Sequence, residues 1–203
     1  MPRQNRVQPD GQIIAHPARG LFMGNRGCLH DAAGHLGRAR WRHPHWITCL
    51  TAFRGRKRPL MQPGLYTELF FLDEAVAAAA GHRPCAECRR AEYAAFRKLW
   101  SALHGPADAG GIDRALHAAR TGGGRQRQHQ APAAGLPEGA FVLWQDAPHL
   151  VTPRGLHPHA PAGYGPPLPR PGGTLTVLTP APLVAMMAAG WRVVLHPSAG
   201  APG

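Results

Sequence analysis

Two cysteines three positions apart are the residues of this sequence best suited to chemistry. Cys85 and Cys88 form a Cys-x-x-Cys within HRPCAECRR, which we expect to be a tight turn that leads into a helix. At this spacing two sulfurs can bind one metal ion, and the backbone amides at a helix start favour the thiolate form. The pair therefore predicts a structural metal site, and zinc is the metal that such sites commonly hold.

A closed structural zinc site needs four ligands, and the chain has two further cysteines, Cys28 and Cys49. Both precede the Cys-x-x-Cys pair, at positions that we expect in a strand or a turn. His30 follows Cys28 by two residues and is an alternative ligand. The predicted site is a structural Zn²⁺ bound by Cys28, Cys49, Cys85 and Cys88, with His30 as the substitute.

Two other interpretations of the pair stay open. A thioredoxin-type redox pair normally follows a strand in a β–α–β unit, whereas Cys85 follows an expected helix. Buried, unreactive cysteines are the second alternative, although two cysteines in a polar turn are poor core residues.

The segment that contains the pair has further distinctive features. It reads TELFFLDEAVAAAAGHRPCAECRRAEY over residues 67–93. A Phe-Phe run precedes a helix with an acidic start, and the helix leads to Gly-His-Arg-Pro-Cys-x-x-Cys. These features resemble the metal-binding domain of Ada-type DNA repair proteins. The resemblance is most specific at 67–93 and extends to roughly residues 20–95 if the preceding strands belong to the same module.

The resemblance implies that Cys85 and Cys88 bind zinc and that a second cysteine pair lies upstream. In the family this second pair is closely spaced, and one of its zinc-bound cysteines accepts a methyl group from DNA phosphotriesters. Here Cys28 and Cys49 are far apart, and the closely spaced element is missing. The resemblance therefore implies a zinc module without implying methyl transfer.

The charge of the chain points to a polyanionic partner. It has 23 Lys and Arg against 11 Asp and Glu, which gives a net charge of +12. Such a balance favours nucleic acid, because each phosphate contact releases condensed counterions. The segments RARWRHPHW (38–46) and RGRKR (54–58) flank Cys49 and combine arginines with aromatic rings that can stack on bases. The predicted contacts, to DNA more than to RNA, are Arg38, Arg40, Trp41, Arg42, Arg54, Arg56, Lys57, Arg58, Arg89 and Arg90.

Two alternative functions stay open. A metal-dependent nuclease of treble-clef type would use a histidine near the metal, and His30 is the candidate. A protein-interaction adaptor would bind its partner with little dependence on salt. The sequence has neither a complete catalytic constellation nor a Gly-rich nucleotide loop followed by Lys-Ser or Lys-Thr. The sequence therefore leaves enzymatic activity open and favours a binding protein over an enzyme.

The sequence contains no membrane or export signal that we can identify. No stretch approaches the roughly 20 apolar residues that span a bilayer. The N-terminus, MPRQNRVQPD, lacks the apolar core of a signal peptide. We therefore expect a cytoplasmic protein without membrane contact, in which cysteines stay reduced or bind metal.

The surrounding elements predict an α+β fold, with a small zinc-stabilised β-hairpin and helix module followed by a short β–α–β unit. Strand-like runs at 46–53 and 65–72 precede a helix that Asp73 caps and Gly81 ends. A second helix is expected over about 86–103, because its apolar residues recur at spacings of three and four.

We expect four regions along the chain. An extended N-terminal segment covers 1–19, and the zinc-binding module with its helices covers 20–120. Residues 121–137 have no hydrophobic period and predict a linker. The C-terminal β–α–β unit, of unknown role, covers 138–203 and ends with the strand RVVLH.

Overall fold

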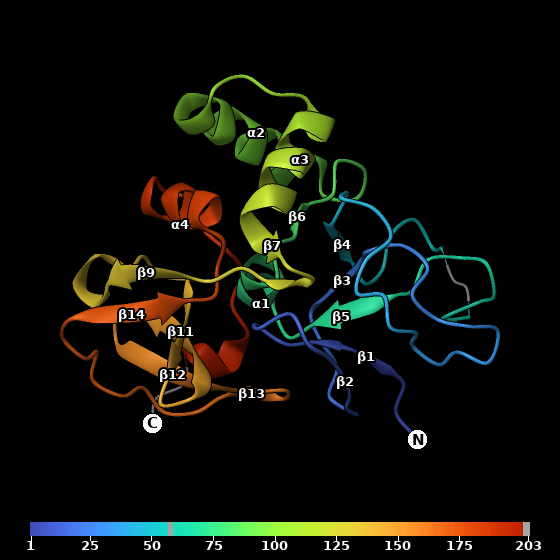
Figure 1. Ribbon diagram of the computed structural model, residues 1–203, viewed down its shortest axis with the longest axis horizontal. Coiled ribbons are helices and arrows are strands. Elements are labelled where there is room, and N and C mark those ends of the chain that lie inside the picture. The colour runs from blue at the N-terminus through green and yellow to red at the C-terminus, as the bar shows by residue number, and fades with distance from the viewer. Residues whose placement is uncertain (57–58, 201–203) are drawn as a thin grey trace.

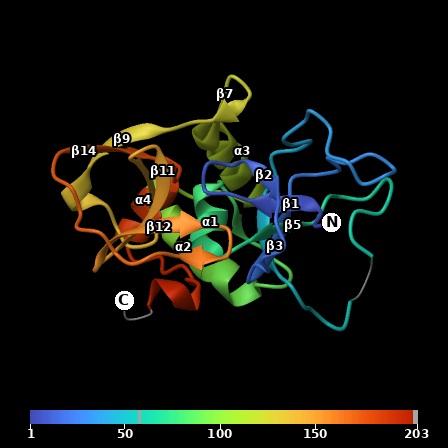
Figure 2. The same cartoon turned by 90° about the horizontal axis from the view of Figure 1, so that it is seen from below.

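Two six-stranded sheets lie on either side of a short central helix, α1 (Glu74–Ala79), as Figures 1 and 2 show. The structure, a computed structural model, describes residues 1–56 and 59–200. The chain has a mixed α+β fold, as predicted. None of the helices in the described part of the chain is long and apolar enough to cross a membrane.

The first sheet comes from the N-terminal half of the chain. Its spatial order is β2-β1-β5-β3-β4-β6. The strands are β1 (Gln4–Val7), β2 (Ile13–Ala15), β3 (Phe22–Asn25), β4 (Ile47–Leu50), β5 (Leu69–Phe71) and β6 (Arg83–Pro84). The two-residue strand β6 runs parallel to β4 and places Pro84 beside Thr48. This pairing brings the turn after β6 next to the end of β4.

Residues 1–19, which we expected as a separate extended segment, form one edge of this sheet. β1 runs parallel to β5, with Arg6 opposite Phe70, and β2 pairs antiparallel with β1. Val7 and Ile13 are buried in the core. β2 is the edge strand and matches a short strand that the sequence suggests at 12–15, whereas β1, between β2 and β5, is stabilised by its neighbours more than by its own propensity.

The central helix α1 forms as its local sequence predicts. The Asp73 side chain caps it by accepting a hydrogen bond of 2.9 Å from the Val76 N–H. Every residue of α1 is buried, and its run of alanines lets both sheets approach closely. Gly81 follows with φ of 87°, a left-handed conformation that ends the helix.

Three further helices lie on one side of the molecule: α2 (Arg90–His104), α3 (Ala109–Arg120) and α4 (Ala181–Ala188). Of the apolar positions at spacings of three and four in α2, Phe96 and Trp100 are buried, whereas Tyr93 is half-buried and Leu103 is exposed. It begins later than expected, because residues 85–89 form the turn that contains the two cysteines.

The second sheet has the order β13-β12-β11-β10-β14-β9. Its strands are β9 (His129–Pro132), β10 (Phe141–Trp144), β11 (Ala147–Thr152), β12 (Gly155–Ala160), β13 (Gly163–Tyr164) and β14 (Thr174–Val177). It is an antiparallel sheet of six strands and therefore larger than the β–α–β unit that we expected.

The predicted linker at 121–137 is instead part of the folded body. It contains the hairpin β7 (Thr121–Gly122) and β8 (Arg125–Gln126), then β9, and then the 3₁₀ turn η1 (Ala133–Gly135). β9 pairs with β14 along its full length, and Ala133 and Leu136 are buried. The backbone pairing with β14 fixes this segment, although its side chains show no hydrophobic period.

The predicted terminal strand RVVLH is not a strand either. Its backbone runs beside the start of α1, where the Val194 N–H donates to Glu74 Oε2 and the Glu74 N–H donates to the Val194 carbonyl, both at 3.0 Å. The His196 N–H donates to Asp73 Oδ2 at 2.9 Å. The start of α1 and its capping residue Asp73 thus form the hydrogen bonds that a neighbouring strand would provide. The 3₁₀ turn η2 (Pro197–Ala199) follows.

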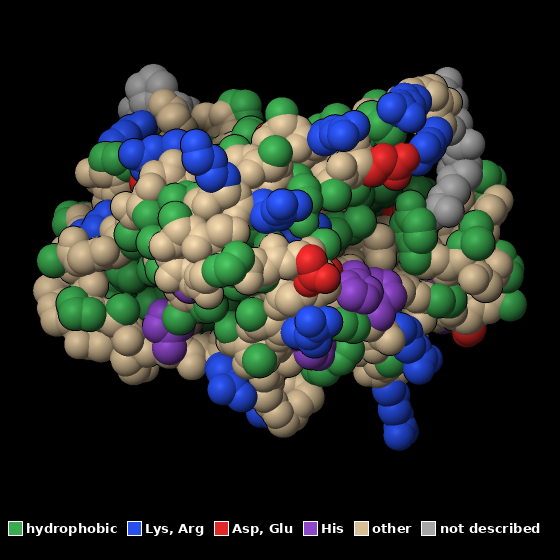
Figure 3. All heavy atoms as spheres, turned by 90° about the horizontal axis from the view of Figure 1, so that it is seen from above, with side chains coloured by type: hydrophobic (Ala, Val, Ile, Leu, Met, Phe, Trp, Pro, Cys, Tyr) green, Lys and Arg blue, Asp and Glu red, His purple; other side chains and the backbone are tan. Residues whose placement is uncertain are grey.

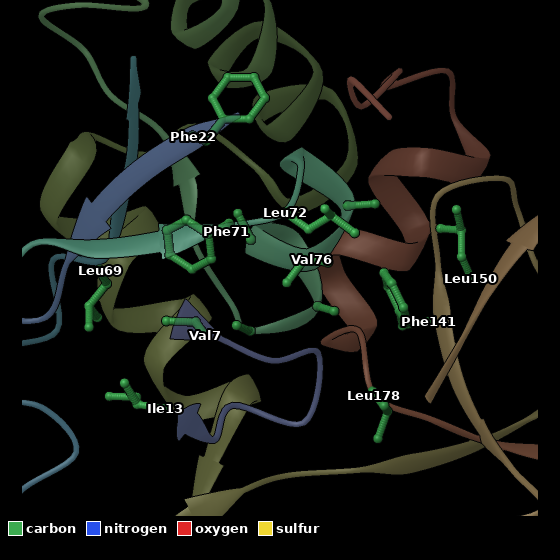
Figure 4. Close-up of a cluster of buried hydrophobic side chains, with 14 of the residues drawn as sticks. Val7, Ile13, Phe22, Leu69, Phe71, Leu72, Val76, Phe141, Leu150 and Leu178 are labelled. Carbon is green, nitrogen blue, oxygen red and sulfur yellow. The ribbon is translucent and has the colours of Figure 1, made fainter. Parts of the chain in front are cut away.

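One hydrophobic core joins the two halves of the chain. Figure 4 shows Phe71 and Val76 from the N-terminal half near Phe141 and Leu178 from the C-terminal half. All four side chains are fully buried. The boundary that we expected between a zinc module and a separate C-terminal unit therefore does not exist as a break in the packing.

Candidate metal centre

Three of the four cysteines meet at the end of β4. The sulfurs of Cys49, Cys85 and Cys88 all lie within 4.8 Å of one another, in a group that can hold a metal ion. We call this group the thiol cluster. β4 supplies Cys49, and the turn between β6 and α2 supplies the other two. The Cys85 N–H donates to the Thr48 carbonyl at 3.0 Å, which fixes the turn against the strand.

The backbone around the thiol cluster donates to its sulfurs. The Leu50 N–H lies 3.4 Å from the Cys88 sulfur, and the Glu87 N–H lies 3.4 Å from the Cys85 sulfur. A hydrogen bond with Cys49 lowers the pKa of the Cys85 thiol to about 5, and backbone N–H groups add to this effect. The same hydrogen bond, together with burial, raises the pKa of Cys49. This shift favours the thiolate form of Cys85, which is the form that binds metals.

The structure does not bring Cys28 or His30 into the thiol cluster. The Cys28 sulfur donates to the backbone oxygen of His30 at 3.6 Å. The His30 ring lies 2.6 Å from Thr67 Oγ1 through Nδ1 and 3.1 Å from the Gln62 carbonyl through Nε2. Both ring nitrogens are thus engaged within the loop, so the predicted substitute ligand and nuclease residue lies away from the three sulfurs.

Two buried ion pairs fix the turn that holds the cluster. Arg83, just before the turn, makes two hydrogen bonds to Asp113 on α3, at 2.7 and 2.8 Å. Arg89, just after Cys88, forms an ion pair of 2.7 Å with Glu74 on α1. Arg89 is only 3 % exposed. It therefore supports the turn and is not part of the surface that we predicted for nucleic acid.

The other residues that we predicted to contact nucleic acid differ in how exposed their side chains are. Trp41 is half-buried, and Lys57 and Arg58 lie outside the described residues. Arg56 pairs with Glu87 at 2.7 Å, on the surface beside the thiol cluster. The predicted contacts with exposed side chains are Arg38, Arg40, Arg42, Arg54, Arg56 and Arg90.

A basic groove along α2, which the sequence analysis missed, begins within the Cys-x-x-Cys turn. It has a volume of about 510 Å³ and is lined mainly by Ala86, Arg90, Tyr93, Arg97, Lys98 and Ser101. None of its three cations pairs with a carboxylate within residues 1–56 and 59–200. Arg90, Tyr93 and Arg97 are three and four residues apart, and this spacing places side chains on one face of a helix. The groove can be recognised in the sequence by this pattern.

Figure 3 shows the face of the molecule formed by α2, α3 and their neighbours. Lysine and arginine side chains are spread over this face, and acidic side chains are sparse on it. The groove along α2 is thus part of a broader positively charged surface.

Comparisons with family models, curated proteins and solved structures find no match for this chain. The Ada-type resemblance therefore depends on residues 67–93 and stays a prediction.

Proposed function

We propose that this chain is a zinc protein that binds nucleic acid, with the thiol cluster as its structural centre and the groove along α2 as its contact surface. The metal and the surface are adjacent, because Ala86, which lines the groove, lies between the two cysteines of the turn.

The donor set of the thiol cluster fits zinc. Zn²⁺ binds thiolates strongly, and the three sulfurs supply three of the four donors of a tetrahedral site. Cys49 is part of a sheet strand, whereas Cys85 and Cys88 lie between two helices. A metal bound by all three would join β4 to the start of α2 and so stabilise the position of the groove.

The observation that supports nucleic-acid binding best is the set of unpaired cations on α2. Arg90, Arg97 and Lys98 are exposed and surround the half-buried ring of Tyr93. Phosphate oxygens suit the arginine and lysine groups, and an unpaired base can stack on the tyrosine ring. The Arg83 guanidinium lies 5.0 Å from that ring and holds it in place from the inside.

The test is fluorescence anisotropy with labelled single-stranded and duplex DNA over a range of salt concentrations. The triple variant Arg90→Gln/Arg97→Gln/Lys98→Gln should lose at least about tenfold in affinity, and the slope of log K against log salt should fall by about three. The matched control is Arg19→Gln/Arg114→Gln/Arg192→Gln, which removes three exposed cations from elsewhere.

Equal losses in the two triple variants would show that binding follows net charge and would overturn the role of the groove. Binding that does not change with salt would contradict the proposal and favour the protein-interaction adaptor.

A further inference from the structure

A second cleft, which we call the arginine cleft, lies away from the thiol cluster. Its volume is about 400 Å³, and the β1–β2 turn, the loop before β4, the end of α3 and the β7–β8 hairpin surround it. Gln126 in the hairpin donates to the Pro9 carbonyl at 3.0 Å and so closes one side. The charged residues in its lining are four arginines and one aspartate, namely Arg26, Arg40, Arg120, Arg125 and Asp10.

Two of these arginines are buried against one tryptophan. Arg26 and Arg120 are 2 % and 1 % exposed. Their guanidinium carbons lie 4.1 and 3.9 Å from the ring centre of Trp46. Cation–π contact with a tryptophan face offsets part of the cost of burying each charge, but it neutralises neither.

The hydrogen bonds of these two guanidinium groups go to neutral acceptors. Arg120 donates to the Gly81 carbonyl at 2.6 Å and to the Pro44 carbonyl at 2.5 Å, and its Nη2 lies 3.3 Å from His117 Nδ1. Among the described residues, Arg26 makes two long contacts, of 3.4 Å each, to His82 Nε2 and to the Gly11 carbonyl. Neither arginine forms an ion pair within the described part of the chain.

Each of the two side chains also keeps a buried nitrogen without a hydrogen-bond partner among the described residues. These are Nη2 of Arg26 and Nε of Arg120. Buried donors of this kind are rare in folded proteins, and buried charges are normally paired. Burial lowers the pKa of both groups to about 9, and repulsion from a neighbouring arginine adds to this shift.

The nearby carboxylates are already engaged. Asp113 accepts hydrogen bonds from Arg83 and lies 2.8 Å from His45 Nδ1. Asp10 accepts from the backbone and side chain of Gln12 at the cleft edge. The cleft thus concentrates positive charge in a partly dry site that also contains an indole ring, Trp41, in its wall.

We propose that the arginine cleft binds the phosphate group of a nucleotide, with Arg26 and Arg120 as its inner donors and Trp41 against the base. Guanidinium groups suit phosphate oxygens, and an aromatic wall suits a nucleobase. Arg40 and Arg125, exposed in the same lining, attract the anion toward the cleft. The nucleotide is either free or the 5′-phosphorylated end of a strand. This inference depends on the cleft alone and not on the groove along α2.

The first experiment is calorimetric titration of the full chain with AMP and with adenosine. AMP should bind at least about tenfold more tightly than adenosine, because only AMP offers a charged partner to the buried arginines. Equal affinities, or no binding of AMP at millimolar concentration, would overturn the proposal.

Variants locate the binding site. Arg26→Gln should abolish AMP binding, and Arg40→Gln/Arg125→Gln, which changes only exposed side chains, should weaken it about fivefold. Arg114→Gln, on α3 but outside the lining, is the matched control and should bind normally. If Arg26→Gln fails to fold, Arg40→Gln/Arg125→Gln is the variant that tests the proposal. Unchanged AMP affinity in this double variant would overturn it.

Oligonucleotides separate the two sources of the nucleotide. A 5′-phosphorylated octamer that binds more tightly than both AMP and the 5′-hydroxyl octamer would assign the cleft to strand ends. AMP that binds as tightly as the phosphorylated octamer would assign it to free nucleotides. The α2 triple variant should keep its AMP affinity, so a failure of the groove proposal and a failure of the cleft proposal give different results.

Discussion

The thiol cluster and the arginine cleft gather side chains in two different ways. The cluster takes two residues from one turn and the third from the adjacent strand. The cleft takes Arg26, Trp46 and Arg120 from three segments that are distant in sequence. Short thiols must be placed by the backbone itself, whereas long arginine side chains reach a common point from separated elements. Local geometry thus builds the first site, and the packing of the whole chain builds the second.

The two sites also differ in what stabilises neighbouring groups of the same charge. In the thiol cluster, a hydrogen bond in which Cys49 and Cys85 share a proton favours the thiolate form of Cys85, and repulsion from Cys85 and Cys88 adds to the raised pKa of Cys49. Guanidinium groups cannot share a proton in this way, and they depend on neutral carbonyls and on the Trp46 ring. The thiol cluster should therefore respond most to metal, and the arginine cleft most to charge and pH.

The largest expected effect comes from Cys85→Ser, which breaks the thiol cluster alone. Under the proposed zinc site, the wild type should contain one zinc per chain and the variant close to none, because two remaining thiols hold the metal poorly. Metal binding contributes to the free energy of folding, so the melting temperature should fall by about 10 °C or more. Elemental analysis and calorimetry measure the two effects.

Cys28→Ser is the matched control, since the Cys28 sulfur lies outside the cluster. It should keep both its zinc and its melting temperature. Loss of zinc in this variant would mean that Cys28 is the fourth ligand that the sequence predicted.

Asp113→Asn tests a residue that affects both sites. It removes the buried partner of Arg83, next to the thiol cluster, and a charge that raises the pKa of Arg120 in the cleft. An unpaired buried guanidinium should cost about 3–5 kcal/mol in the free energy of unfolding. Urea denaturation measures this cost, with the exposed Glu138→Gln as the control. A loss below about 1 kcal/mol would show that the pair is dispensable.

His82, which lies beside the two buried arginines, should make the free energy of unfolding fall in mild acid. Burial, and then the charges of Arg26 and Arg120, lower the pKa of His82 well below 6.5. The unfolded chain therefore takes up this proton before the folded chain does, so stability is fully present above pH 6.5 and decreases below it. The loss approaches about 1.4 kcal/mol per pH unit.

Urea denaturation of the wild type and His82→Gln between pH 7.5 and pH 5 isolates this contribution. The variant should lose less stability on acidification than the wild type. His35→Gln changes an exposed histidine and should follow the wild type. Parallel pH profiles for the wild type and His82→Gln would show that His82 is not the group responsible.

The smallest effect is expected for Glu87→Gln, at the surface of the thiol cluster. Glu87 and Arg56 are both more than half exposed, and ion pairs of this kind contribute little to stability. The melting temperature should not change. DNA affinity at low salt should rise about twofold, because Arg56 is released and a negative charge is lost. A clear fall in melting temperature would show that this pair supports the turn.

The sequence predicted the elements whose causes are local. Asp73 and Gly81 marked both ends of α1, and the apolar spacing in α2 identified the face that buries Phe96 and Trp100. Residues 121–137 were misjudged as a linker because β9 exists through its pairing with β14, more than 40 residues away. The strand expected at RVVLH does not form for the converse reason: Glu74 and the capping residue Asp73 form hydrogen bonds with this segment in place of a neighbouring strand.

The sequence by itself determined that Cys85 and Cys88 share one turn, because a spacing of three residues is fixed by the local backbone. Only the tertiary structure decided that Cys49 joins them and Cys28 does not, since this depends on the parallel pairing of β6 with β4. The same holds for Arg26 and Arg120. Nothing in their local sequence distinguishes them from the other arginines, and they meet because folding buries both against one indole ring.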